Sequence, residues 1–180
     1  MVFTMTDPSG DSFFPPLLKS KGIQSMRSLE ITESGEVWDE FYETFKFRPS
    51  VNGPFPAIVE PLHSITFRLR DQYKDTELDE LRDVIFHAFS IAIGPLEEIY
   101  YLDWQHECFG IKIDVPSFTV NGYPDGDYAI FLGKNMQSGT FGHPWEGSIC
   151  FFGDVFVNEI LKTRPSILGG AIRNEGGYAL

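Results

Sequence analysis

The chain has 180 residues, of which 42% are hydrophobic and 15% aromatic, so it can bury one sizeable core and is expected to form a single domain. Its 26 acidic and 14 basic side chains give a formal net charge of -12. Phosphate contacts require a basic surface, so this balance argues against direct nucleic-acid binding and favours a basic protein as partner.

Cysteine usage and hydropathy indicate a cytoplasmic protein. Cys108 and Cys150 lie in apolar runs and belong to no CxxC pair, so we interpret both as buried thiols in a reducing compartment. The first ten residues contain no Lys or Arg and lead into no apolar stretch, so no secretory signal is expected. No apolar run has the length of a membrane span, so no membrane partner is expected.

The first part of the chain is predicted to hold one amphipathic helix. Residues 1–27 are rich in turn dipeptides and are expected to be a loosely ordered N-terminal extension. Residues 28–32 suit a short edge strand. A helix is predicted over residues 36–45, with Ser34 or Gly35 as its boundary. Its apolar face carries Val37, Trp38, Phe41, Tyr42 and Phe45.

The opposite face of this helix is acidic and consists of Glu36, Asp39, Glu40 and Glu43. From Leu29 to Thr44 there are six acidic residues and no Lys or Arg, so like charges repel with nothing local to offset them. One explanation is a solvated helix face whose first acids favour the positive end of the helix dipole. The other is a surface that docks a basic partner.

The middle of the chain predicts a loop, a strand and the main helix. Residues 47–61 contain four prolines and an Asn-Gly pair, which is typical of a loop. Residues 63–70 alternate strictly, so His63 is expected to begin the core face of a strand. An apolar stripe over residues 76–92 predicts a long helix, ended by Gly94 and Pro95 and packed across the sheet.

The last third predicts an antiparallel meander. Residues 98–114 suit two strands or one bent strand, with a turn or bulge at 105–107, and the runs 128–132 and 148–152 suit two buried strands. Residues 133–147, with four glycines, are expected to form a long loop, and residues 154–162 a short helix. The class is therefore α+β: an antiparallel sheet with one long helix and one or two shorter helices, in a domain of residues 28–164 followed by a loose tail of 165–180.

Two polar clusters are candidates for chemistry. Asp103 and His106, together with His143 and Glu146, would supply imidazole and carboxylate groups to a divalent metal or to acid-base catalysis if the strands brought them together. No HExxH or similar spacing fixes these donors, so no metal and no cofactor is predicted.

Other catalytic motifs have weaker support. Ser148 lacks the second glycine of a nucleophile elbow, and Cys150 lies between apolar residues. Gly133 and Lys134 lack the spacing of a phosphate-binding loop. Trp145, in the GTFGHPWEG stretch, is either an aromatic anchor for a partner or a plug that closes the end of the sheet.

Two segments resemble the signature of a bacterial family of uncharacterised proteins, defined only as a domain of unknown function. They are LDWQHECF, residues 102–109, and YPDGDYAIFL followed by GTFGHPWEGSICFFG, within residues 123–153. The resemblance extends over about residues 34–161. It implies a bacterial origin and a small intracellular domain, and it implies no reaction.

Two functions of different kinds follow. The first is a non-enzymatic acidic interaction protein of the immunity or antitoxin kind, which neutralises a basic toxin such as a nuclease through Glu36, Asp39, Glu40, Glu43 and Trp145. A stress or phage-defence accessory protein within a larger assembly fits the same features. The second is a small enzyme or ligand-binding protein with a site between residues 103–107 and 143–146.

Overall fold

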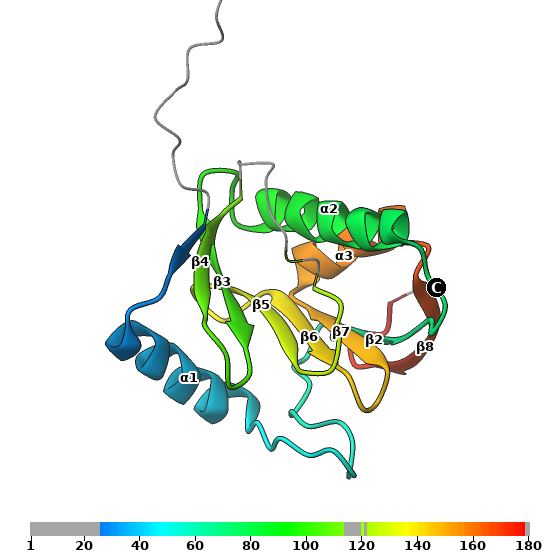
Figure 1. Ribbon diagram of the computed structural model, residues 1–180. Coiled ribbons are helices and arrows are strands. Elements are labelled where there is room, and N and C mark those ends of the chain that lie inside the picture. The colour runs from blue at the N-terminus through cyan, green and yellow to red at the C-terminus, as the bar shows by residue number, and fades with distance from the viewer. Residues whose placement is uncertain (1–25, 114–119, 121, 179–180) are drawn as a thin grey trace, which may run out of the picture.

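The computed structural model describes residues 26–113, 120 and 122–178. Within them the chain forms one sheet of eight strands and three helices (Figure 1). The strands are β1 (Met26–Ser28), β2 (Ser64–Leu69), β3 (Glu98–Asp103), β4 (Phe109–Lys112), β5 (Ala129–Gly133), β6 (Gly139–His143), β7 (Ser148–Phe152) and β8 (Leu168–Asn174). The helices are α1 (Ile31–Phe45), α2 (Asp75–Ala92) and α3 (Asp154–Thr163).

The sheet lies between two helical layers. Its strand order is β1-β4-β3-β5-β6-β7-β2-β8, and every neighbouring pair is antiparallel. Figure 1 shows α2 and α3 on one face of the twisted sheet and α1 on the other. The predicted α+β class is confirmed. Strands β5, β6 and β7 form a meander, but β6 is not among the strands expected from the sequence, which lie in residues 98–114, 128–132 and 148–152.

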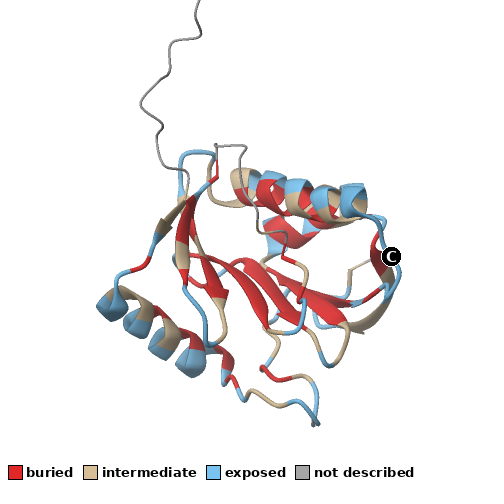
Figure 2. Ribbon diagram, in the orientation of Figure 1, coloured by how far each residue is buried: buried red, intermediate tan, exposed pale blue. Residues whose placement is uncertain are grey.

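Each face of the sheet has its own hydrophobic core. In β7, Ile149 and Phe151 belong to the core beneath α2 and α3, whereas Cys150 and Phe152 belong to the core beneath α1. This alternation follows from the two-residue period of a strand. Figure 2 shows the consequence, since the central strands are buried throughout. Both cysteines are buried and free, as the sequence predicts.

Helix α1 begins earlier than predicted. The Ser34 N–H donates to the Glu30 carbonyl at 2.8 Å, so Ser34 and Gly35 lie inside the first turns instead of capping them. Gly35 is exposed, and a Cβ there would meet nothing within 4 Å. A solvent-facing glycine costs helix stability without blocking the helix, which is why it is a poor boundary signal here.

His63 does not begin the core face of β2. It lies just before the strand, its side chain is exposed and its backbone has φ 63. The strand begins at Ser64, whose hydroxyl donates to the Pro61 carbonyl at 2.7 Å. Ile65, Phe67 and Leu69 are buried as predicted.

The prediction of a long loop over residues 133–147 is wrong, because this segment contains the central strand β6. A side chain at Gly142 would lie 3.0 Å from the Ala129 carbonyl oxygen and 3.1 Å from Pro124, and one at Gly139 would collide with the Phe131 carbonyl. These glycines are therefore strand residues that let neighbouring backbone approach closely, not turn residues.

The prediction of a loosely held tail after Pro165 is also wrong. Residues 168–174 form β8, which pairs with β2 and closes one edge of the sheet with two register shifts. The rest of the expected N-terminal extension lies outside the described residues, but Met26 and Arg27 belong to β1 at the other edge. None of the described helices is both long and apolar enough to cross a lipid bilayer.

Candidate functional site

The outward face of α1 carries the predicted acidic residues. Val37, Phe41 and Phe45 point into the core, with Phe41 and Phe45 at most 1% exposed. The opposite side is exposed along the whole helix (Figure 2), and there lie Glu36, Asp39, Glu40 and Glu43, which we call the acidic face. Packing of the aromatic side of α1 thus orients four carboxylates towards solvent.

Within the described residues, none of the four carboxylates of the acidic face has a hydrogen-bond or ion-pair partner. Glu33, one turn earlier, differs, because Arg27 contacts it at 2.7 Å and also contacts Glu98 at 2.8 Å. The hydrogen bond from Arg27 lowers the pKa of Glu33. The uncompensated charge therefore starts at Glu36 and continues to the end of the helix.

An apolar groove begins where the acidic face ends. It has a volume of about 490 Å3 and lies between the end of α1, residues 59–63, the β5–β6 turn and the start of α3. Among the residues that line it are Phe45, Val59, Leu62, Met136 and Phe152. Val59 is 62% exposed and Leu62 78%, which is unusual for large apolar side chains and typical of a contact surface.

Trp145 is partly exposed and partly packed against the protein. It lies in the turn between β6 and β7, its ring is 5.1 Å from that of Tyr128, and 37% of its surface is exposed. Phe55 is 39% exposed, and its ring centroid lies 4.7 Å from that of His143, with the two rings nearly perpendicular. Two partly exposed aromatic side chains therefore border one buried cluster on the α1 side of the sheet.

His143 and Glu146 join a buried ionic cluster with residues far away in sequence. Arg173 in β8 donates to both Glu146 oxygens, at 2.6 and 2.7 Å, and to Glu60 at 2.8 Å. Thr66 also donates to Glu60, at 2.6 Å. Burial opposes ionisation of Glu146, but hydrogen bonds from Arg173 and Ser148 hold its pKa below the ordinary value. The charged groups of Glu60, Glu146 and Arg173 satisfy one another, which indicates a structural role.

His143 is held neutral by its surroundings. It is 1% exposed, and its Nδ1 accepts the Glu146 backbone N–H at 3.2 Å, so the proton of the neutral ring lies on Nε2. Among the described residues this Nε2 has no hydrogen-bond partner. The pKa of His143 is lowered to about 4, chiefly by burial; the charge of Glu146 opposes this shift and that of Arg173 adds to it.

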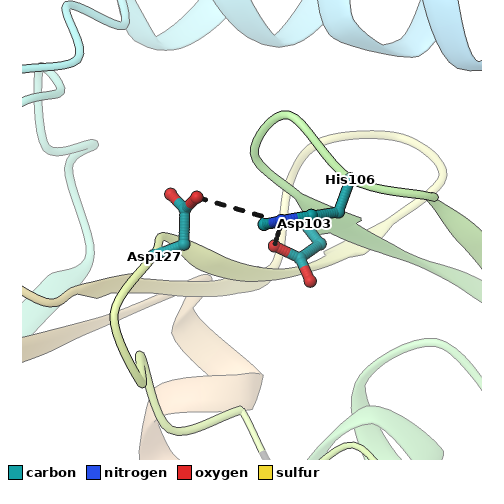
Figure 3. A group of neighbouring side chains, drawn as sticks. All are labelled: Asp103, His106 and Asp127. Atoms are coloured by element: carbon teal, nitrogen blue, oxygen red, sulfur yellow. Dashed lines mark hydrogen bonds and ion pairs between the residues drawn. The ribbon is translucent and has the colours of Figure 1, made fainter.

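Asp103 and His106 meet a third residue, Asp127. The Nδ1 of His106 lies 3.0 Å from Asp103 and 3.9 Å from Asp127, and Figure 3 shows the imidazole between the two carboxylates. The hydrogen bond and charge of Asp103 raise the pKa of His106. Burial raises the pKa of Asp127.

The two candidate clusters do not combine into one site. In β3, Asp103 alternates with Leu102, which belongs to the core beneath α1, so Asp103 faces the other way. In β6, Phe141 belongs to the core beneath α1. His143 lies two residues later and therefore faces the same side as Phe141. The side chains of Asp103 and His143 therefore project from opposite faces of the sheet.

The candidate nucleophiles are occupied or buried. Ser148 donates its hydroxyl to Glu146 at 2.6 Å. Cys150 is 1% exposed, and burial raises the pKa of its thiol well above the usual range. Neither has the accessible, activated state that covalent catalysis needs.

Sequence reasoning missed Asp127, Glu60 and Arg173. Asp127 had a usable signal, because it precedes a strand that pairs with the strand of Asp103. Glu60 and Arg173 had none, since they lie 113 residues apart and meet only because β8 pairs with β2. The apolar groove likewise assembles from four separate segments.

Comparison with known proteins identifies a family. A family model described as "Protein of unknown function (DUF2716)" matches residues 28–157. The chain is also 26% identical, over 160 residues, to "Uncharacterized protein YxiI" of Bacillus subtilis (strain 168), covering 81% of this chain and 98% of that protein. No solved structure gives a significant match. The resemblance to an uncharacterised bacterial family is confirmed: the chain belongs to the DUF2716 family.

Proposed function

We propose that this protein is a non-enzymatic binding protein of the immunity or antitoxin kind, which neutralises a basic partner such as a toxic nuclease. The observation that carries the proposal is the acidic face of α1, with its four exposed carboxylates and no cation paired to them in the described residues. Such a surface attracts a basic protein and accelerates its association. Occupying the basic surface of a nuclease blocks the phosphate contacts that the nuclease needs.

The apolar groove would give the complex a long lifetime, which attraction between charges alone does not provide. Glu36, Glu40 and Thr44 follow one another at four-residue spacing along α1, and Thr44 lines the groove. A partner lying along this row meets carboxylates first and then the exposed side chains of Val59 and Leu62. Charge guides encounter, whereas an apolar side chain buried in a groove slows dissociation.

The rival function, an enzyme with a site between the two polar clusters, receives no support from the geometry. Asp103 and His143 project from opposite faces of the sheet, and Glu146 is engaged by Arg173. Trp145, with 37% of its surface exposed, is proposed as a peripheral partner contact.

The test is affinity capture from the native host with the full chain as bait, at low and at high salt. A variant with Glu36→Gln, Asp39→Asn, Glu40→Gln and Glu43→Gln is compared with a control that neutralises four exposed acids elsewhere, Glu97→Gln, Glu107→Gln, Asp125→Asn and Glu175→Gln. Both variants change the formal net charge of -12 equally. Support is a basic partner that the wild type and the control retain and the α1 variant loses. Equal capture by all three baits contradicts the proposal.

A further inference from the structure

Three side chains converge where the β3–β4 turn meets the segment before β5. Asp103 ends β3, His106 lies in the following turn, and Asp127 precedes β5. Strands β3 and β5 are neighbours, with Asp103 opposite Ala129, so the pairing register brings Asp127 beside the turn. One donor atom from each residue lies within 4.8 Å of the other two. Figure 3 shows all three pointing into one small region.

Backbone contacts position the residues that carry the three donors. The His106 N–H donates to the Asp103 carbonyl at 3.1 Å and closes the turn. One oxygen of Asp127 accepts the Tyr128 N–H at 2.8 Å, which leaves the other oxygen directed at His106. Tyr128 is 1% exposed and packed among aromatic rings, so the backbone that carries Asp127 is anchored. Fixed donors lower the ordering cost of binding a ligand.

The charge of the cluster is only partly balanced from within the protein. Among the described residues, neither Asp103 nor Asp127 pairs with a Lys or Arg, and both carboxylates share the single imidazole of His106. His106 is 63% exposed on its side chain, so the cluster is open to solvent. A cation of higher charge fits this position better than one proton on the imidazole does.

We propose that Asp103, His106 and Asp127 bind a divalent transition-metal ion of the Zn2+ type, with solvent completing its coordination. One imidazole nitrogen and two carboxylate oxygens are ligands that such ions accept, whereas Ca2+ requires six to eight oxygens. Tetrahedral zinc bonds of the usual length separate ligand atoms by roughly 3.4 Å. The separations of 3.0 and 3.9 Å from His106 lie on either side of this value. Small side-chain rotations therefore suffice, and the site is independent of the proposed function.

Calorimetric titration of the chelator-treated full chain with Zn2+ tests the site, and Co2+ absorption reports the coordination. His106→Gln and Asp127→Asn remove one ligand each. Matched controls are His63→Gln and Asp125→Asn, which change an exposed histidine and an exposed aspartate outside the cluster. The expected result is one saturable site, weakened at least roughly tenfold by the ligand variants and unchanged in the controls.

Thermal unfolding of the metal-free variants shows whether any loss of binding comes from misfolding. A second pair of ligand variants, His106→Asn and Asp103→Asn, is measured in the same way. The proposal is overturned by the absence of a saturable site in the wild type. It is equally overturned if all four ligand variants fold like the wild type and bind Zn2+ with unchanged affinity.

Discussion

Arg173 in β8 donates two hydrogen bonds, of 2.6 and 2.7 Å, to Glu146 in the β6–β7 turn. This contact connects the last strand of the sheet to the central meander. The same guanidinium donates to Glu60 at 2.8 Å. The side chains of Glu60 and Glu146 are only 5% and 10% exposed, so both depend on Arg173 for compensation.

Replacing Arg173 with Met is therefore expected to destabilise the fold strongly. Two carboxylates would stay buried without a cation, and breaking a buried pair typically costs about 3–5 kcal/mol. Urea unfolding gives the value directly. Arg82→Met, which removes the contacts with Asp79 and Asp83, whose side chains are 59% and 69% exposed, serves as control and should change stability by less than about 1 kcal/mol. Equal changes in the free energy of unfolding for the two substitutions would show that the buried ion pairs contribute no more to stability than exposed ones.

Stability is expected to fall in mildly acidic solution because of His143. Its pKa in the folded chain is about 4, below its ordinary value of 6.5, so the unfolded chain takes up a proton first as pH falls. The contribution is complete above pH 6.5 and is lost between pH 6.5 and 4. At about 1.4 kcal/mol per pKa unit, the loss is roughly 3 kcal/mol.

The measurement is the free energy of unfolding from pH 7 to pH 4 for the wild type, His143→Asn and His87→Gln. The Asn side chain keeps an acceptor for the Glu146 N–H, and His87 is exposed. The slope with pH should be shallower in His143→Asn alone. Parallel slopes in all three proteins would show that this histidine is not the group responsible.

Two glycines are expected to respond in opposite directions to alanine. At Gly139 the new Cβ would collide with the Phe131 carbonyl and approach the Phe152 ring at 2.8 Å, so Gly139→Ala should cost about 1–3 kcal/mol. At Gly35 the new Cβ meets nothing within 4 Å inside α1, so Gly35→Ala should stabilise by about 0.5–1 kcal/mol. Thermal unfolding of both variants checks the signs, and destabilisation by Gly35→Ala would mean that α1 does not begin at Ile31.

Leu62 is expected to matter for partner binding and not for folding. It is 78% exposed and lines the groove, whereas Leu96 is 79% exposed outside it. Leu62→Ser should weaken binding of the captured partner roughly tenfold, chiefly through faster dissociation, and Leu96→Ser should leave it unchanged. Surface plasmon resonance measures both. If the two variants behave alike, the groove is not part of the interface, although the acidic face could still be.

Much of the fold could be predicted from hydrophobic periodicity. Helix α2 has a clear helical period that gives its buried face, and β5 and β7 are short apolar runs of the kind that form strands buried on both faces. Strand β6 could not be found in this way, because Gly139 and Gly142 are there to admit neighbouring backbone, a property of the assembled sheet. Strand β8 also contains paired glycines, and its strand character comes from pairing with β2.

The candidate site divides in the same manner. The acidic face was predictable because its four residues share one helix and one spacing rule. The projection of Asp103 and His143 from opposite faces of the sheet could not be predicted, since it depends on the register of strands that lie far apart in sequence. The contact between His106 and Asp127 and the pairing of Glu60 with Arg173 depend on register too.

The most direct test of the central claim is the association rate constant of the captured partner as a function of ionic strength. For the wild type and for the control variant neutralised at Glu97, Glu107, Asp125 and Glu175, the rate should fall steeply between about 50 and 500 mM salt, because screening weakens attraction between exposed charges. For the variant neutralised across the acidic face, association should be slower at low salt and nearly independent of salt. An unchanged rate and an unchanged salt dependence in that variant would contradict the account.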